Sequence, residues 1–389
     1  MVRLTSRTLD QIDSPIGVTH ALLDQRRGDR PLLDLAQAAP AYPAAPVVIE
    51  HILAAAQDRH GGNYVPTGGL PRLREAFAEE LSRDYRGRVG GEHVLITAGC
   101  NQAFCLVTSA LAEPGDEIIL TLPYYFNHDM WLRLDGVLPV YLDPGPDLVP
   151  SAAAAAELIT PRTRAIVLVT PGNPTGLTIG PDVIAEFAAL ASGHGIALVL
   201  DETYRSFRGT DEPAHGLFTD PQWMDTVVSL HSFSKDLAIP GYRVGAVVAA
   251  PALLRETMKL LDCVAICAPR VGQEAAWAGL VHAGDWRRAR AEELTRKRNL
   301  FAATMAERPG GFDLLAVGGF FGWVRHPFPG RPTGDVVREL AVEYDALTIP
   351  GTAFEPDDRG TIRVSFSNAD EAALTDFASR LAAAGPPPP

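Results

Sequence analysis

Short apolar runs alternate with alanine-rich stretches of helical spacing from about residue 50 to residue 285. The runs lack the regular polar positions of a half-exposed strand, so they predict strands that are buried on both faces. They are "AIVLVT" (165–170), "IALVLDE" (196–202), "TVVSL" (226–230) and "VGAVVAA" (244–250). Between the first two, "PDVIAEFAALASGHG" begins with a helix-opening proline and ends near glycines, which predicts a crossover helix. This order of elements predicts an α/β fold with a mostly parallel sheet.

The pattern changes after residue 285. The stretch "RARAEELTRKRNLFAATMAE" (288–307) mixes charged and apolar positions at helical spacing, which predicts a long exposed helix leading into a second unit. Shorter runs such as "FFGWVR" and "TIRVSFS" follow, as in a small α+β domain. We therefore expect a large domain at 46–285 and a small domain made of 1–45 and 286–389. "SAAAAAEL" predicts a helix start, and "AAAGPPPP" a frayed tail.

Length and charge limit the classes of partner. A chain of 389 residues can bury a sizeable core, and its formal charge of −13 repels both nucleic-acid phosphates and anionic lipids. No stretch has the length and apolar character of a membrane span, and the N-terminal segment lacks the apolar centre of a signal peptide. We expect a cytoplasmic protein that binds neither nucleic acid nor membrane.

The spacing of the cysteines does not predict a metal site. The four cysteines, Cys100, Cys105, Cys263 and Cys267, form no C-x-x-C pair. Zinc sites and disulfide frameworks need tighter or more numerous clusters. We expect buried, reduced thiols and no bound metal.

The candidate chemistry follows the predicted strands. Ligands of an open α/β sheet lie beyond the carboxyl ends of its strands, where this chain has "PGNPTG", "DETYRSF", "HSFSK" and "TAGCNQAF". The turn through Gly99, Cys100 and Asn101 begins a helix, whose free N–H groups suit a phosphate. By itself this turn is better explained by a glycine that chain packing requires.

Further groups near the same edge suit a phosphate. Arg243 follows a Pro-Gly turn and offers a fork of donors, and Ser232 and Ser234 offer hydroxyls. The chain has no G-x-x-x-x-G-K-[ST] loop, and no G-x-G-x-x-G follows the first strand of a βαβ unit. The phosphate is therefore not expected to belong to ATP or NAD.

A lysine and an aspartate complete the pattern. A lysine partly removed from water has a depressed pKa and can form a Schiff base, which gives Lys235 a role beside a phosphate. Asp201 could pair with a protonated pyridine nitrogen. Taken singly, Lys235 is better explained as a surface lysine and Asp201 as a helix cap or strand-end turn residue. Together with the phosphate groups they favour pyridoxal phosphate.

At this point the chain resembles the class I/II aminotransferases, which are pyridoxal-phosphate enzymes of fold type I. The motifs "NYVPTGGLPRLREAF", "TPGNPTG", "DETYRSF", "SFSK…GYRVG" and "TIRVSFS" occur in the order and at the intervals of that family. The likeness extends from about residue 34 to residue 370. It implies a seven-stranded, mostly parallel sheet in the large domain.

The resemblance also implies a set of cofactor residues. Lys235 would carry the Schiff base and move a proton between the substrate Cα and the cofactor. Asp201 would hold the pyridine nitrogen, and Tyr204 and Asn173 the phenolic oxygen, while Tyr125 would stack on the ring. The phosphate ligands would be Arg243, Ser232, Ser234 and the turn of Gly99, Cys100 and Asn101.

Substrate and partner residues follow in the same way. Arg363 of "TIRVSFS" would grip the substrate α-carboxylate, and Tyr64 of "NYVPTGG" would reach the cofactor phosphate of a partner chain, which implies a homodimer. Ala38 stands where the family usually has glycine, and its added methyl narrows the approach to the substrate carboxylate. Arg270 could contact a partner's site or be an ordinary interface arginine.

The implied reaction is transfer of an amino group from an L-amino acid to a 2-oxo acid. Two alternatives keep the cofactor: elimination, cyclisation or oxidation from the same intermediate, which Ala38 keeps open, and a non-catalytic sensor. The sensor is disfavoured because the catalytic set is intact and no basic DNA-binding extension is present. A Rossmann dehydrogenase is disfavoured because its glycine fingerprint is missing. The substrates themselves are not predicted.

Overall fold

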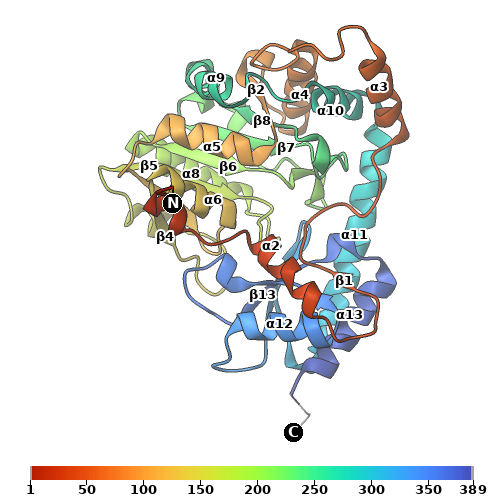
Figure 1. Cartoon of the computed structure of the whole chain (residues 1–389). Helices are drawn as coiled ribbons and strands as arrows, with labels where there is room; N and C mark the ends of the chain where they lie inside the picture. The colour runs from red at the N-terminus through yellow and green to blue at the C-terminus, as the bar shows by residue number, and fades with distance from the viewer. Residues whose placement is uncertain (1, 387–389) are drawn as a thin grey trace.

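A seven-stranded sheet forms the centre of the larger part of the molecule (Figure 1). A computed structural model describes residues 2–386. The strand order is β2-β8-β7-β6-β5-β3-β4, and only β8 runs antiparallel to its neighbours. The strands are β2 (Val94–Thr97), β3 (Glu117–Thr121), β4 (Leu138–Leu142), β5 (Thr163–Val169), β6 (Ala197–Asp201), β7 (Val227–Ser232) and β8 (Gly245–Val248). The prediction of a mostly parallel seven-stranded sheet is confirmed, and all four predicted strands are present.

The reversed direction of β8 matters for the site. A parallel connection needs a crossover of a dozen or more residues, usually a helix, but only the 3₁₀ turn η6 (Pro240–Tyr242) lies between β7 and β8. The chain therefore folds straight back, and Ser232 pairs with Gly245 across the two strands. Residues after β7 and residues before β8 consequently meet at one edge of the sheet.

Helices cover both faces of this sheet. Alternate strand residues point to opposite sides: Ile166 and Leu168 pack in the core with α3, α4, α8 and α10, whereas Ala165 and Val167 pack with α5, α6 and α9. These helices are α3 (Pro46–Gln57), α4 (Pro71–Asp84), α5 (Cys100–Leu111), α6 (Phe126–Asp135), α8 (Pro181–His194), α9 (Pro251–Ala265) and α10 (Arg270–His282). The crossover helix predicted after residue 180 is α8.

A separate antiparallel sheet, of order β12-β13-β10-β9, forms the smaller part. Its strands are β9 (Asp313–Gly318), β10 (Phe321–Arg325), β12 (Ile349–Pro350) and β13 (Thr361–Ser365). Near it, β1 (Leu33–Asp34) pairs with β11 (Ala346–Leu347). The remaining helices are α1 (Ser6–Leu9), α2 (Pro15–His20), α7 (Ala152–Ala156), α11 (Gly284–Ala306), α12 (Thr333–Glu343) and α13 (Glu371–Ala384). Short 3₁₀ turns are η1 (Ala21–Gln25), η2 (Gly91–His93), η3 (Arg205–Phe207), η4 (Leu217–Thr219), η5 (Trp223–Asp225), η7 (Pro309–Gly311), η8 (Gly351–Ala353) and η9 (Phe366–Asn368).

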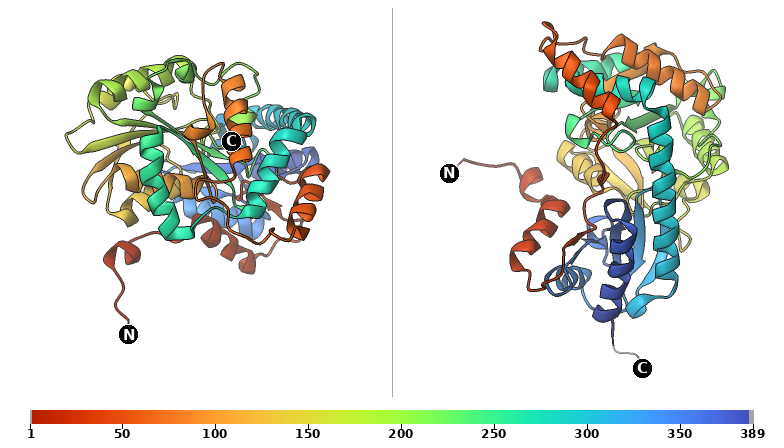
Figure 2. Two further views of the ribbon diagram at one scale, coloured as in Figure 1. Left: turned by 90° about the horizontal axis from the view of Figure 1, so that it is seen from above. Right: turned by 90° about the vertical axis from the view of Figure 1, so that its right-hand side faces the viewer.

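Helix α11 runs from the larger part to the smaller one along one side of the molecule (Figure 2). The prediction of a long helix here is correct, but the prediction that it is exposed is wrong. Leu294, Phe301 and Met305 are buried in the core of the smaller part. Their spacing of seven and four residues gives the helix one apolar stripe among its charges.

Two further predictions need correction. Residues 382–384 of the expected frayed tail belong to α13, while residues 387–389 lie outside the described residues. All four cysteines are free, but only Cys100 is buried, and Cys263 on α9 is exposed because it faces away from the sheet core. The helix start predicted at residue 151 is correct: Ser151 caps α7 by accepting from the N–H of Ala154 at 3.3 Å.

Within residues 2–386 no helix is both long and apolar enough to cross a bilayer. In the same part of the chain no group of three or more His, Cys, Asp or Glu side chains is arranged to hold a metal ion. The cytoplasmic location stays a prediction.

Candidate active site

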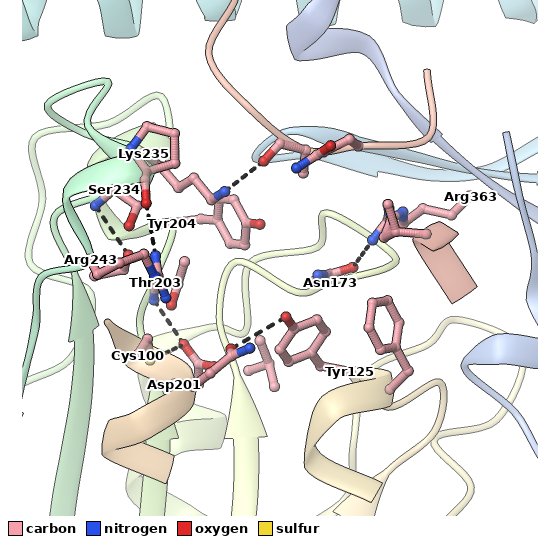
Figure 3. A pocket seen from close by; sticks show the side chains of 18 residues that line it. Cys100, Tyr125, Asn173, Asp201, Thr203, Tyr204, Ser234, Lys235, Arg243 and Arg363 are labelled. Atoms are coloured by element: carbon pink, nitrogen blue, oxygen red, sulfur yellow. Dashed lines mark hydrogen bonds between the residues drawn. The ribbon is translucent and has the colours of Figure 1, made fainter. Parts of the chain in front are cut away.

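A cavity of about 310 Å³ opens at the carboxyl edge of the large sheet, between it and the smaller part (Figure 3). Strands β5, β6 and β7 end at this cavity, α5 and α6 begin there, and residues 36–38 and β13 close it from the other side. The structure brings twelve of the predicted residues into its lining: Ala38, Cys100, Asn101, Tyr125, Asn173, Asp201, Tyr204, Ser232, Ser234, Lys235, Arg243 and Arg363.

Three residues considered from the sequence do not line the cavity. Gly99 lies directly behind it, with a φ of +88°, and a Cβ there would fall 2.4 Å from Nη2 of Arg243. Tyr64 lies between α3 and α4 and is 77% exposed. Arg270 donates from Nη1 to the carbonyl of His60 at 2.6 Å, so it is held against the segment that precedes Tyr64.

Lys235 is unlike the other two lysines of the chain. Lys259 and Lys297 lie on helices and pair with Glu256 at 2.6 Å and Glu293 at 3.2 Å. Among the described residues no carboxylate lies within 4.0 Å of Nζ of Lys235, which donates to the carbonyl oxygen of Ala38 at 2.6 Å. Burial, together with the nearby charges of Arg243 and Arg363, lowers the pKa of Lys235 to about 8. At pH 7 about a tenth of this amine is therefore neutral and nucleophilic, far more than for an ordinary lysine.

Asp201 is an ionised carboxylate at the buried end of the cavity. Its Oδ2 lies 3.3 Å from Nε2 of His128, and its Oδ1 accepts from the N–H of Thr203 at 3.0 Å and from the thiol of Cys100 at 3.6 Å. Burial alone would raise the pKa of Asp201, but the hydrogen bonds and the charge of His128 outweigh it and lower that pKa. The carboxylate can therefore stabilise a positive charge that enters the cavity.

An anion-binding corner lies beside Lys235. The first N–H groups of α5 have no intrahelical acceptor and face the cavity from Cys100 and Asn101. Ser232 and Ser234 contribute hydroxyls. Within residues 2–386, the side chain of Arg243 donates only to the carbonyls of Pro240 at 2.9 Å and Ala98 at 3.4 Å. Hydroxyls, helix N–H groups and a guanidinium without a carboxylate partner are the donor set that a phosphate requires.

Arg363 is the other arginine that lines the cavity. Like Arg243, it has no carboxylate partner among residues 2–386. It is 2% exposed and donates from Nη1 to Oδ1 of Asn173 at 2.9 Å and from Nη2 to the carbonyl of Ala36. Its Nε is buried with no hydrogen-bond partner. Burial lowers the pKa of Arg363 to about 10, so it stays charged at neutral pH. A buried, uncompensated guanidinium is costly, and an entering carboxylate would offset that cost.

Two tyrosines line the space between these charges. Burial raises the pKa of Tyr125 to about 12 and that of Tyr204 further, so both hydroxyls remain protonated donors. The hydroxyl of Tyr125 donates to Oδ1 of Asn101 at 3.3 Å. The cavity therefore combines a flat aromatic wall with hydroxyl donors.

The sequence analysis assigned no site role to seven lining or contacting residues: His128, Thr203, Ile16, Gln37, Phe126, Val169 and Pro240. His128 could have been found from the sequence. It lies in the first turn of α6, three residues after Tyr125, which caps that helix, so the two side chains lie on the same side of the helix. It also stacks on Phe104 of α5, with ring centroids 3.8 Å apart. Ile16 belongs to α2, which carries none of the sequence motifs and reaches the cavity through the tertiary fold.

Comparison with known proteins gives a consistent result. A family model described as aminotransferase class I and II matches residues 30–381. The chain is 29% identical over 329 residues to an aromatic aminotransferase of Arabidopsis thaliana, covering 82% of this chain and 81% of that protein. It is 31% identical over 306 residues to an arginine–pyruvate transaminase of Pseudomonas aeruginosa, covering 78% and 77%.

A solved structure of the aspartate aminotransferase of Thermus thermophilus with maleate gives a TM-score of 0.88 at 25% identity, over 99% of this chain and 100% of that one. The family match includes every residue that lines the cavity except Ile16.

Proposed function

The chain belongs to the aminotransferase class I and II family, and on that premise we propose that Lys235 and Asp201 work with bound pyridoxal phosphate to move an amino group from an amino acid to a 2-oxo acid. The family, the aspartate aminotransferase-like fold and the aminotransferase class of enzyme are confirmed predictions. The cofactor, the residue roles, the substrates and the dimer belong to the proposal.

The observation that carries the proposal is the isolation of Lys235. Lys235 is the lysine without a carboxylate partner in the described chain. It is partly buried, and it lies in the same cavity as an ionised Asp201. An amine in this state can attack an aldehyde, whereas Lys259 and Lys297 are held by glutamates.

The cavity residues fit the cofactor at both ends. Asp201 would hold a proton on the ring nitrogen, with His128 keeping the carboxylate ionised and oriented. The start of α5, Ser232, Ser234 and Arg243 would hold the phosphate, and Tyr125 would lie against the ring. Tyr204 and Asn173 would donate to the phenolic oxygen. When bound, pyridoxal phosphate supplies an aldehyde carbon that accepts amines and a ring that withdraws electrons from the substrate's Cα–H bond.

The chain's own groups would carry out the remaining steps. Arg363 would bind the substrate α-carboxylate with its forked donors and so place the Cα–H bond near Lys235. Nζ of Lys235 would accept and hold the proton that leaves the substrate Cα. The carbonyl of Ala38, 2.6 Å from Nζ, lies where it can orient that amine.

We further propose a homodimer in which Tyr64 enters the partner's site. The support is its exposure of 77% on a chain whose other tyrosines at the site are enclosed. We assign the large domain to residues 46–285 and the small domain to 1–45 and 286–389, since the two sheets have separate cores.

Amino transfer from a ¹⁵N-labelled amino acid to an unlabelled 2-oxo acid tests the proposal, with purified protein, added pyridoxal phosphate and a panel of donors. We expect ¹⁵N in the acceptor, and none with Lys235→Ala, while Lys259→Ala remains active. Release of free ammonia without labelled acceptor, or full activity of Lys235→Ala, would overturn it.

A further inference from the structure

A buried ion cluster lies next in sequence to two residues of the active site. It joins Glu80 of α4, Arg205 of η3, Asp236 and Arg287 of α11. Arg287 donates from Nη1 to Oε2 of Glu80 at 2.6 Å and from Nη2 to Oδ2 of Asp236 at 2.6 Å. Arg205 pairs with the other oxygen of Glu80. None of these four residues lines the active-site cavity.

The cluster is largely buried, although all four residues line a second cavity of about 700 Å³. The side chains of Glu80, Asp236, Arg205 and Arg287 are 4%, 9%, 12% and 15% exposed. Burial alone would raise the pKa of Glu80, but the two guanidinium groups outweigh it and lower that pKa to about 2. In the described part of the chain, Arg287 is the one cation within 4.0 Å of the Asp236 carboxylate. Loss of either partner would leave a buried charge uncompensated, so these contacts hold their segments firmly.

The members of the cluster connect three separate segments. Asp236 directly follows Lys235, and Arg205 directly follows Tyr204. Arg287 stands near the start of α11, whose later turns are buried in the core of the smaller part through Leu294 and Phe301. One guanidinium thus ties the long helix to the chain segments that present the reactive amine and a cofactor hydroxyl.

We propose that Arg287 is a positioning residue: through Asp236 and Glu80 it fixes the segments that carry Lys235 and Tyr204, and so couples the orientation of α11 to the geometry of the active site. This inference rests on the proposed role of Lys235. It assigns a functional role to residues that would otherwise count as structural ion pairs.

Kinetics of the cofactor-loaded enzyme provide the first test, using Asp236→Ala, Arg287→Met and the double variant. Arg162→Met is the matched control, because Arg162 pairs with the buried Glu117 at the amino end of β3 and β5, away from the cavity. We expect each single change to lower kcat about 10-fold with KM changed less than about threefold, as for a displaced catalytic group. The double variant should match Arg287→Met, because removing Arg287 already breaks its contact with Asp236.

A second readout does not use turnover. In cofactor-free protein, the pH dependence of Lys235 acetylation, measured by mass spectrometry with Lys259 as internal reference, should have its midpoint near 8 in the wild type. In Asp236→Ala it should rise by about 1 pH unit as the amine gains access to water. Asp236→Asn keeps an acceptor for Arg287 and should give a kcat between those of the wild type and Asp236→Ala. This variant provides the test if Asp236→Ala does not fold.

The outcomes separate the two proposals. An inactive wild type, or an active Lys235→Ala, would contradict the proposed function. An active wild type and inactive Lys235→Ala, with Asp236 and Arg287 variants that match Arg162→Met in kcat and in the acetylation midpoint, would overturn the positioning role alone.

Discussion

Nε2 of His128 lies 3.3 Å from Oδ2 of Asp201, and both side chains are buried at the inner end of the active-site cavity. The opposing effects on the Asp201 carboxylate are burial, which favours protonation, and His128, which favours ionisation. His128 therefore keeps Asp201 ionised, as its proposed role toward a cofactor nitrogen requires, although His128 is not predicted to touch the substrate.

His128→Leu should raise the pKa of Asp201, because burial is then opposed only by Thr203 and Cys100. The carboxylate is lost as pH falls through its pKa, so the acid limb of the kcat/KM profile should move upward. A pH–rate profile that extends down to about pH 4, near the ordinary pKa of an aspartate, measures this shift. His326→Leu, the same change on the smaller part, is the control, and a profile for His128→Leu that superimposes on the wild type would refute the role.

Arg363→Gln should lower kcat/KM for amino acids about 100-fold or more, because two charge-assisted hydrogen bonds to a carboxylate are lost. Steady-state kinetics with an amino acid and with the corresponding amine, which lacks the carboxylate, show whether the loss depends on the substrate carboxylate. Arg380 is a matched control, since it is equally buried but is already paired with Asp376 at 2.6 Å. Arg380→Gln should lower the melting temperature and leave KM unchanged. An equal loss for carboxylate and amine substrates in Arg363→Gln would contradict carboxylate binding.

Gly99→Ala should weaken cofactor binding about 10-fold or more, because a Cβ would meet the Arg243 guanidinium at 2.4 Å. Gly115 has a similar φ, +95° against +88°, but a Cβ there has open space. Gly115→Ala should therefore show the backbone penalty of about 1–2 kcal/mol without any loss of affinity. Titration of both variants with pyridoxal phosphate separates the two effects, and equal affinities would show that Arg243 is not needed for binding.

Lys235→Met should stabilise the cofactor-free protein. The folded-state pKa of about 8 lies below the ordinary lysine value of 10.5, so the unfolded chain binds more protons and wild-type stability rises as pH increases from about 8 to 10.5. Below pH 8 the wild type carries nearly the full penalty, which makes the variant more stable by about 3 kcal/mol at pH 7. Urea unfolding at pH 7 and pH 10 tests this, and an advantage that grows with pH would contradict the burial of Lys235.

Much of the fold and site could be predicted from local patterns. The buried strands end at "PGNPTG", "DETYRSF" and "HSFSK", and in a parallel sheet such ends meet at one edge, so Asn173, Asp201 and Lys235 were expected to be close. The structure places them in one cavity. Arg363, nearly 130 residues after Lys235, was assigned only through the family resemblance, because no local pattern relates β13 to the large sheet.

The remaining features depend on contacts that sequence patterns do not encode. The carbonyl of Ala38 accepts from Lys235 across 197 positions of chain, and Arg287 reaches Glu80 across 207. The burial of one face of α11 was missed because its many charges mask a sparse apolar stripe. The reversal of β8 was not predicted either, since a run such as "VGAVVAA" has no direction of its own.

Peptide mapping after borohydride reduction tests the central claim most directly. The protein has three lysines, so the phosphopyridoxyl group can be assigned without ambiguity among Lys235, Lys259 and Lys297. The account predicts one phosphopyridoxyl group per chain, on Lys235, and none after prior addition of an amino-acid substrate. Labelling of Lys259 or Lys297, or no labelling in protein saturated with pyridoxal phosphate, would contradict it.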